Sequence, residues 1–331
     1  MTELPHTLRP GVYTCTSTVP ACLGTSRGGA AVVAQADAGE PGKAVRLDSL
    51  EQAQAFGAQS ALYRMAAILL KAGVSPIWAV PAGEDYAAAY AACEPLDDVL
   101  AVTGDGGVQE LCEHVRHCCE HGRERIGVLP AADVQSACSN AKTADFPHVA
   151  IVCDGGTKPE KTAAAFTAVV ACASAGANLN GEILPVEDFD GTLSDTDIET
   201  LLKCGVTPIE RLDKKGSIVR AVTSCTSVLG RETRAYSSLS AVLAADDVVR
   251  TIRQAVRLRL KGMKNTPVTR ESIASQIVVE LENKQAQGVI DRYLPPVVRE
   301  HPADPAVCDV TLQFQAAPEM SQIIISAQIL L

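Results

Sequence analysis

VLAVTGDGGVQELCEHVRHCCEHGRERIGVLPAADVQSACSNAKTADFPHVAIVC, residues 99–153, is the stretch that decides the fold class. It holds three short apolar runs, VLAVTG (99–104), RIGVLP (125–130) and HVAIVC (148–153). Between them lie stretches of helical character, 107–121 and 131–141. Short apolar strands that alternate with helices predict a mostly parallel sheet, because each crossover helix carries the chain back to the same end of the sheet.

The same alternation extends to both sides of this stretch. The further expected strands are AAVVAQ (30–35) and SPIWAV (75–80), and the further expected helices cover 49–72 and 159–175. After about Gly205 the pattern changes. There we expect a strand at 217–225, long helices at 240–261 and 269–286, and strands at 308–315 and 322–331 joined by a Pro318-Glu319 turn. The sequence therefore predicts an α/β fold with helices on both faces of its sheet, followed by a C-terminal α+β domain.

Four segments are expected on this basis. They are an N-terminal strand arm (1–20), an α/β domain (21–215), a C-terminal α+β domain (216–317) and a C-terminal strand arm (318–331). The first arm contains GVYTCTSTV between two prolines, which favours an extended strand without a local partner. In 309–315, Val310, Leu312 and Phe314 share one face of a strand.

Composition narrows the classes of function. The 331 residues are 47% hydrophobic and carry a net charge of −10, which argues against a general nucleic-acid binder. No apolar run approaches the roughly 20 residues needed to cross a bilayer, so we expect no membrane insertion. The start, MTELPHTLRP, has no apolar signal core, so we expect the protein to be made and kept in the cytoplasm. Its 12 cysteines include no CxxC pair and are expected to be free and mostly buried.

The sharpest signal for an enzyme is the run DFDGTL at 188–193. It matches the DxDGT signature of haloacid-dehalogenase-type phosphatases, in which two aspartates work with Mg²⁺ at the end of a buried strand. That reading makes Asp188 the nucleophile and Asp190 the acid/base. The preceding run, EILPVE, contains Pro185, which does not belong in a central strand. We therefore expect the motif to be catalytically silent, with Ser194 capping a helix that Gly205 ends.

The run CEHVRHCCEH at 112–121 holds residue types that bind metals. On a helical projection, Cys112, Cys118 and Cys119 join an apolar stripe, while His114, His117 and His121 fall on the opposite side. We expect buried thiols, solvated histidines and no metal or other cofactor. His117 and His121 could chelate a transition metal weakly, but a closed site needs ligands from another element.

Two glycine clusters follow expected strands, at 104–107 and 154–157. Neither matches GxGxxG or GxxxxGK[ST], so we interpret them as tight turns rather than as phosphate sites.

A basic stripe runs along the expected helix at 240–264. It consists of Arg250, Arg253, Arg257, Lys261 and Lys264. It lies beside an expected buried stripe of Val249, Ile252, Val256, Leu260 and Met263. A basic stripe on a protein of net negative charge favours binding to an acidic surface of a partner protein.

Several segments together resemble the tail sheath proteins of contractile phage tails and phage-derived bacteriocins. The start Arg9-Pro10-Gly11-Val12-Tyr13 is similar to the family's RPGVY opening, and KAGVSPIWAV (71–80) is similar to a later landmark. Leu201–Pro208 and Arg220–Ser224 also fit, in the right order along nearly the whole chain. The chain is short for the family and resembles its minimal forms.

The resemblance implies a subtilisin-like fold for the middle domain and a structural, non-enzymatic function. Sheath subunits form stacked six-membered rings around an inner tail tube and shorten to drive that tube through a target envelope. The resemblance further implies a particle assembled in a bacterial cytoplasm, with baseplate and tail terminator proteins as partners.

Two groups of residues receive roles under this hypothesis. The arms would pair with sheets of neighbouring subunits through Pro10, Gly11, Val12, Tyr13, Ile323, Ile325, Ile329 and Leu331. The basic stripe would face the tube. The alternative is a cytosolic Mg²⁺-dependent phosphatase that uses Asp188 and Asp190.

Overall fold

The structure is a computed structural model that describes residues 28–228, 231–232, 237–260 and 263–320. The arm residues Pro10, Gly11, Val12, Tyr13, Ile323, Ile325, Ile329 and Leu331, together with Lys261, lie outside the described residues. Within the described residues, no helix combines the length and the apolar character that crossing a bilayer would require.

An eight-stranded sheet forms the centre of the body, in the order β2-β3-β1-β4-β5-β6-β7-β8. Its strands are β1 Gly29–Ala34, β2 Val45–Leu47, β3 Ile77–Pro81, β4 Val99–Gly104, β5 Ile126–Ala131, β6 Val149–Cys153, β7 Val206–Leu212 and β8 Lys215–Ile218. The inner pairs are all parallel, and only the outermost strands β2 and β8 pair antiparallel. The predicted α/β class with a mostly parallel sheet is confirmed.

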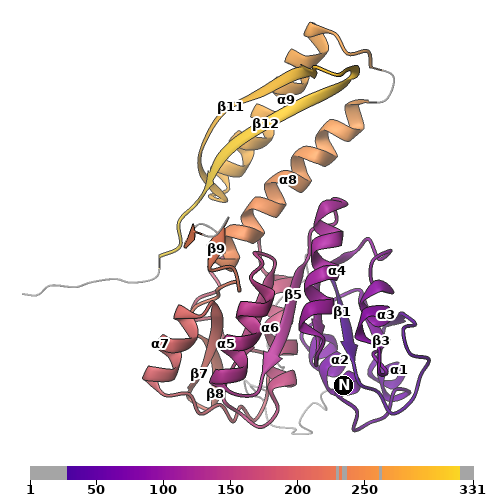
Figure 1. Ribbon diagram of the computed structural model, residues 1–331, viewed down its shortest axis with the longest axis vertical. Coiled ribbons are helices and arrows are strands. Elements are labelled where there is room, and N and C mark those ends of the chain that lie inside the picture. Colours follow the sequence, from indigo (N-terminus) through magenta and orange to yellow (C-terminus); the bar gives the residue numbers. More distant parts are fainter. Residues whose placement is uncertain (1–27, 229–230, 233–236, 261–262, 321–331) are drawn as a thin grey trace, which may run out of the picture.

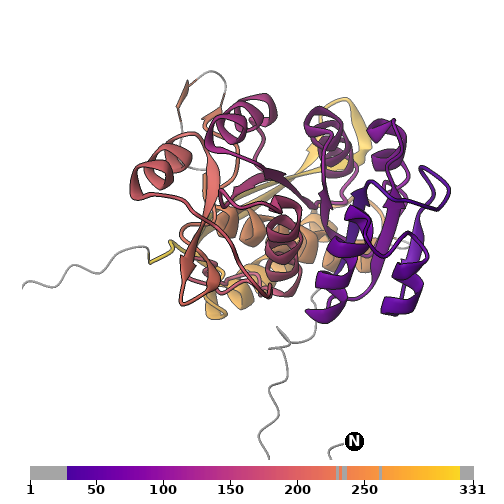
Figure 2. The same cartoon turned by 90° about the horizontal axis from the view of Figure 1, so that it is seen from below.

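Helices cover both faces of this sheet (Figure 1, Figure 2). One face is packed by α3 Tyr86–Ala91, α4 Val108–Glu120, α5 Val134–Ala144 and α7 Asp195–Lys203. The other is packed by α1 Leu50–Gln54, α2 Ala61–Lys71 and α6 Pro159–Cys172. The most enclosed of these helices is α6, in which every residue from Thr162 to Ala171 is buried.

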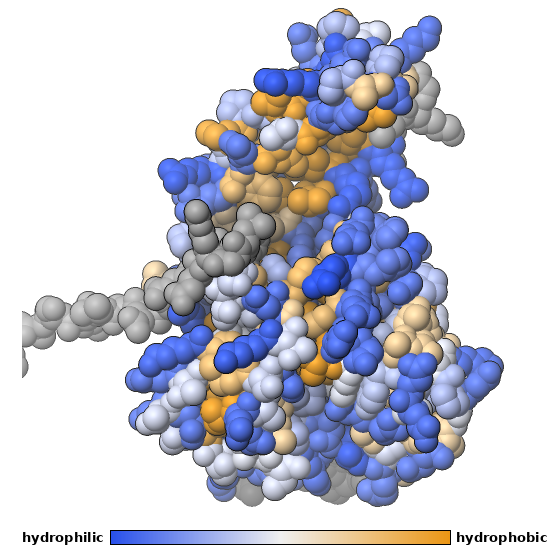
Figure 3. Space-filling model, in the orientation of Figure 1, coloured by the Kyte–Doolittle hydropathy of each residue, from blue (hydrophilic) through white to orange (hydrophobic). Residues whose placement is uncertain are grey.

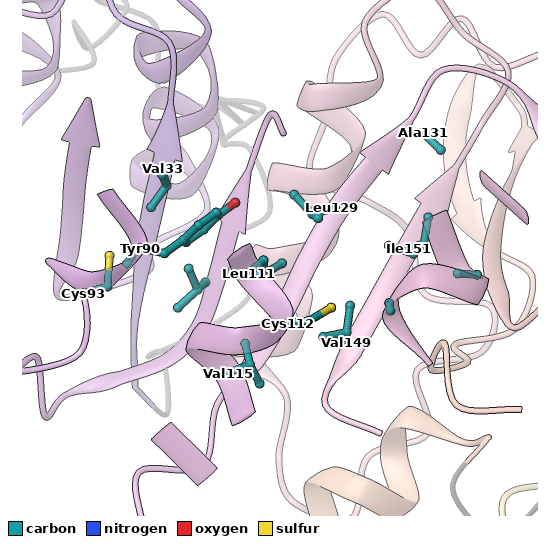
Figure 4. Close-up of a cluster of buried hydrophobic side chains, with 14 of the residues drawn as sticks. Val33, Tyr90, Cys93, Leu111, Cys112, Val115, Leu129, Ala131, Val149 and Ile151 are labelled. Carbon is teal, nitrogen blue, oxygen red and sulfur yellow. The ribbon is translucent and has the colours of Figure 1, made fainter. Parts of the chain in front are cut away.

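Side chains of the strands point alternately to the two faces of the sheet. In β6, Val149 and Ile151 join the core under α4 and α5, whereas Ala150 and Val152 join the core under α6. Figure 4 shows the first of these cores, in which Leu111 and Val115 of α4 lie over the strands. Because both faces are buried, the strands are apolar at nearly every position, which is why the sequence marks them so clearly.

A second unit projects from the body on α8 Leu239–Leu260, a helix of 22 residues (Figure 1). It consists of the outer part of α8, α9 Pro267–Ala286, and an antiparallel pair of β11 Ile290–His301 with β12 Asp304–Ala316. Its core contains Val248 and Ile252 of α8, Ile273 and Ile277 of α9, and Ile290 of β11. A separate two-stranded pair, β9 Ser227–Val228 and β10 Arg231–Glu232, lies beside the base of α8.

One predicted strand is wrong in extent. The strand expected at 217–225 ends at Ile218. Beyond it, side chains satisfy the backbone, because Asn180 Oδ1 accepts from Ala221 N and Thr207 Oγ1 accepts from Val222 N. The strand at 308–315 pairs with β11. Its expected partner at 322–331 lies outside the described residues. The expected turn at Pro318-Glu319 is instead an attachment point to the body, described below.

Candidate functional site

The DFDGTL motif lies in a loop between α6 and α7 and not at the end of a strand. Phe189 is 4% exposed and separates the exposed residues Asp188 and Asp190. Asp190 accepts hydrogen bonds from Thr157 N (3.2 Å) and Thr157 Oγ1 (2.5 Å), and those bonds lower its pKa. The carboxylate therefore ties the loop to the turn after β6. Ser194 begins α7 with a capping box to Asp197, as predicted.

In the glycine cluster after β4, side chains and backbone of the protein itself fill the space next to the turn. Asp105 Oδ1 accepts from Tyr86 Oη at 2.7 Å, and its Oδ2 accepts from Gln35 N at 2.9 Å. Gly107 has a φ of 75°, and a Cβ at this position would meet Tyr86 Cβ at 2.8 Å. Tyrosine packing accounts for these glycines, which agrees with the interpretation of the cluster as a turn.

Helix α4 differs from the prediction at one histidine. His114, expected to be solvated, is 3% exposed. It lies 3.5 Å from Arg125 Nη1 and 3.9 Å from Cys118 Sγ. Burial, and next the charge of Arg125, lower the pKa of His114 to about 3. The helical projection missed this because the segment before β5 covers that side of α4, a contact that periodicity does not report.

The other two histidines of α4 lie toward solvent, as expected. His117 has 48% of its side chain exposed, and His121 is exposed as well. The ten described cysteines form no disulfide with one another, and five of them are buried, including Cys112 and Cys118. Among the described residues, no group of three or more His, Cys, Asp or Glu is arranged to hold a metal ion.

The basic stripe on α8 divides into two parts. Arg250 Nη2 donates to Glu124 O at 2.9 Å, and Arg253 binds both carboxylate oxygens of Glu124 (2.5 and 3.0 Å). Burial acts to raise the pKa of Glu124, but the hydrogen bonds from Arg253, a backbone hydrogen bond and the charges of Arg253 and Arg250 together hold that pKa below its usual value. Arg257 and Lys264 are exposed. Two members of the stripe thus join α8 to the loop before β5, and two are free to meet a partner.

The buried stripe of α8 is also shifted from the prediction. Val248 is fully buried in place of Val249, and Met263 is 43% exposed. The reason is that α8 packs first on the body, through Val242 and Leu243, and then on α9. A helical projection assumes that one face of the helix is buried along its whole length. Helix α8 packs on two different elements in turn, so its buried face changes along the helix.

Another charged contact fixes the base of α8. His148 Nε2, at the start of β6, lies 2.9 Å from Asp246 Oδ1, and both side chains are largely buried. Burial opposes a charge on His148, but hydrogen bonds and charge interactions with Asp246 and Cys119 together outweigh burial and raise the pKa to about 10. Lys284 of α9 pairs with Asp247 one residue further along α8. Ion pairs therefore connect α8 to the body on one side and to α9 on the other.

The β11–β12 pair exposes apolar side chains on one of its faces. Tyr293 and Phe314 lie opposite each other and pack toward α9. Leu294 and Val297, 58% and 39% exposed, lie opposite Gln313 and Thr311. Figure 3 shows apolar residues gathered on this upper part of the molecule. In the described residues the sheet has two strands, so each strand has one edge without a neighbouring strand. The sequence did not predict this surface, because it predicted no strand at 290–301.

The chain is attached to the body just after β12. Glu319 Oε1 accepts from Ser238 Oγ at 2.7 Å, next to the start of α8, and Asn178 Nδ2 donates to Met320 O at 3.1 Å. Ala317 N also donates to Val289 O at 3.1 Å. The segment that follows Met320 therefore starts from a fixed point at the junction of the two units.

Comparison with solved structures places this fold among sheath tail proteins. The sheath tail protein from Desulfitobacterium hafniense matches with a TM-score of 0.66 and 13% identity, over 92% of this chain and 100% of that one. The sheath tail protein from Listeria innocua matches with a TM-score of 0.68 and 11% identity, over 89% of this chain and 93% of that one. No protein-family model and no curated protein matches the sequence. At these identities the likeness establishes the shared fold.

Proposed function

We propose that this chain is the structural subunit of a contractile tail sheath, and that it forms stacked six-membered rings around an inner tail tube. The observation that carries the proposal is the extent of the shared fold, which covers nearly the full length of two proteins described as sheath tail proteins.

The β11–β12 pair supplies the surface for polymerisation. An open strand edge accepts a further strand, whose backbone N–H and C=O groups it pairs. The arms 10–19 and 322–331 are the strands that the sequence offers. Covering a large apolar side chain such as Leu294 contributes about 1.5–3 kcal/mol. Neighbouring subunits joined in this way stay connected when the sheath shortens.

Exposed basic residues are the proposed contact with the inner tube. Arg257 and Lys264 carry this role, because Arg250 and Arg253 are engaged within the subunit. Screened ion pairs suit a contact that must release during contraction, since each contributes at most about 1 kcal/mol. Baseplate and terminator proteins are the further proposed partners, and no catalytic role is proposed.

Electron microscopy of the purified full-length protein tests this function. We expect rings or tubes whose formation rises with protein concentration. Leu294→Lys with Val297→Lys should leave the circular dichroism spectrum unchanged, because both side chains are partly exposed in the single subunit. The double change should abolish the rings, because strand addition would bury two charged lysines beside the added strand. Arg299→Lys, an exposed conservative change on β11, is the matched control. Uniform particles of single-subunit size at every concentration would contradict the proposal.

A further inference from the structure

His117 and His121 lie one helical turn apart on the outer side of α4. Their ring centroids are 4.2 Å apart, and the ring planes are inclined by 39°. Residues at positions i and i+4 share one face of a helix, so the two rings can present nitrogen atoms to one point. Neither side chain contributes to the apolar core under α4.

The Nδ1 atom of each ring faces a protein oxygen. His121 Nδ1 lies 2.7 Å from His117 O, and His117 Nδ1 lies 3.5 Å from Glu94 Oε2. An imidazole that donates from Nδ1 keeps Nε2 as its acceptor atom. Histidines that bind metals show this same arrangement, in which a carbonyl or carboxylate fixes the tautomer and the orientation of the ring.

The rings border a surface hollow of about 210 Å³, lined by Glu94, Pro95, His117, Cys118, His121 and Arg123. The one guanidinium in this lining is already bound. Arg123 Nη1 donates to Glu94 O at 2.6 Å, and its Nε lies 3.3 Å from Asp97 Oδ1. The hollow thus leaves room beside the two rings for an ion and its water ligands.

We propose that His117 and His121 form a two-histidine chelate for a divalent ion of the late first-row transition metals, with Glu94 as a positioning residue. Imidazole nitrogen favours Zn²⁺, Ni²⁺ and Cu²⁺ over Mg²⁺ or Ca²⁺. The chain supplies two ligands, so the remaining positions are open to water or to a side chain from another molecule. The proposal does not depend on a sheath function.

Titration of the untagged full-length protein with NiCl2 in a calorimeter tests the site. We expect one site on the wild type, and none on His117→Gln or His121→Gln. Glu94→Gln should weaken binding by about 10-fold or more, because the ring of His117 loses its carboxylate partner. His301→Gln, at the end of β11, is the control and should bind like the wild type.

A thermal readout separates binding at this site from binding elsewhere. Saturating Ni²⁺ should raise the melting temperature of the wild type and of His301→Gln, and should leave that of His121→Gln unchanged. Circular dichroism checks that each variant is folded. A wild type that binds no Ni²⁺, or Ni²⁺ binding of equal affinity in the wild type and in a folded His117→Gln, overturns the proposal.

Discussion

His148 carries its charge at the junction between the body and α8, where its partner Asp246 is 8% exposed. A histidine is ordinarily half-protonated near pH 6.5, and here the pKa is raised to about 10. The folded protein therefore holds a proton that the unfolded chain releases. The contribution to stability is complete below about pH 6.5, declines as pH rises, and is lost above about pH 10.

His148→Gln should remove this pH dependence. Between pH 7 and 9, the free energy of unfolding of the wild type should fall more steeply than that of the variant, by up to about 1.4 kcal/mol per pH unit. Urea unfolding followed by circular dichroism at several pH values measures the difference. Parallel curves for the two proteins would show that the proton on His148 is not linked to folding.

The two aspartates of the DFDGTL loop should have structural effects only. Asp190→Asn should lower stability by about 1 kcal/mol, because a charged acceptor for two Thr157 donors is lost. Asp188→Asn should change little. Neither protein, nor the wild type, should hydrolyse p-nitrophenyl phosphate with Mg²⁺. A wild-type turnover that Asp188→Asn abolishes would restore the phosphatase hypothesis.

At the scale of elements, two residues of the basic stripe also hold α8 against the body, so a mutation in the stripe can change stability as well as partner binding. Glu124 has 10% of its side chain exposed, and Arg253 is its ion-pair partner. Arg253→Glu would place a second carboxylate against a buried one and should cost about 2 kcal/mol or more of stability. Any loss of assembly in that variant would report misfolding as well as a lost contact.

Arg257→Glu with Lys264→Glu separates the two effects, because both side chains are exposed. We expect unchanged thermal stability and normal sheath self-assembly, with weakened assembly on the inner tube. Cosedimentation with preformed tubes measures the last of these. Arg257→Lys is the control that keeps the charge. Wild-type binding to tubes by the charge-reversed protein would rule out this stripe as the tube contact.

The accuracy of the sequence predictions follows how each element is buried. Strands β4 and β6 lie between two layers of helices, so both of their faces are apolar and their bounds were predicted within about one residue. Strand β11 contains Pro295-Pro296, which argues against a central strand. It belongs to an open pair instead, and its register shifts between Leu294 and Val297 to accommodate the prolines.

Contacts between distant segments set the other limit on prediction. The residues Tyr86–Ala91 show no clear apolar face, and no helix was predicted there. Helix α3 forms because Asp85 caps its N-terminus and Tyr90 is buried beneath it. The burial of His114 and the pairing of Arg253 with Glu124 likewise depend on elements that meet only in the folded chain. For the candidate site, the sequence identified the residues of the basic stripe but not which of them remain free.

In the whole molecule, the chain that follows β12 leaves from the near end of the β11–β12 pair, at the junction with the body. The chain is fixed through Glu319 at the base of α8, next to the body. The β11–β12 pair extends away from that point along the outer part of α8 and α9 (Figure 1). Under the proposed function, an arm that starts at this junction would pair with another subunit, and the open strand edge of its own subunit would receive the arm of a neighbour.

Ending the chain after Met320 should yield a folded protein that forms neither rings nor tubes, and deletion of residues 1–19 should do the same. The attachments of Glu319 and Met320 are retained, so the melting temperature and the circular dichroism spectrum should stay close to those of the wild type. What is lost is a strand that would bury Ile323, Ile325 and Ile329 on a neighbour, at about 1.5–3 kcal/mol for each large side chain. A full-length chain with these three residues changed to Ser is the matched control for length and should also fail to assemble. Electron microscopy and sedimentation velocity measure the outcome. If the shortened chain still formed sheath of normal length, subunits would be joined through their bodies and not through exchanged strands, even with the sheath function correct.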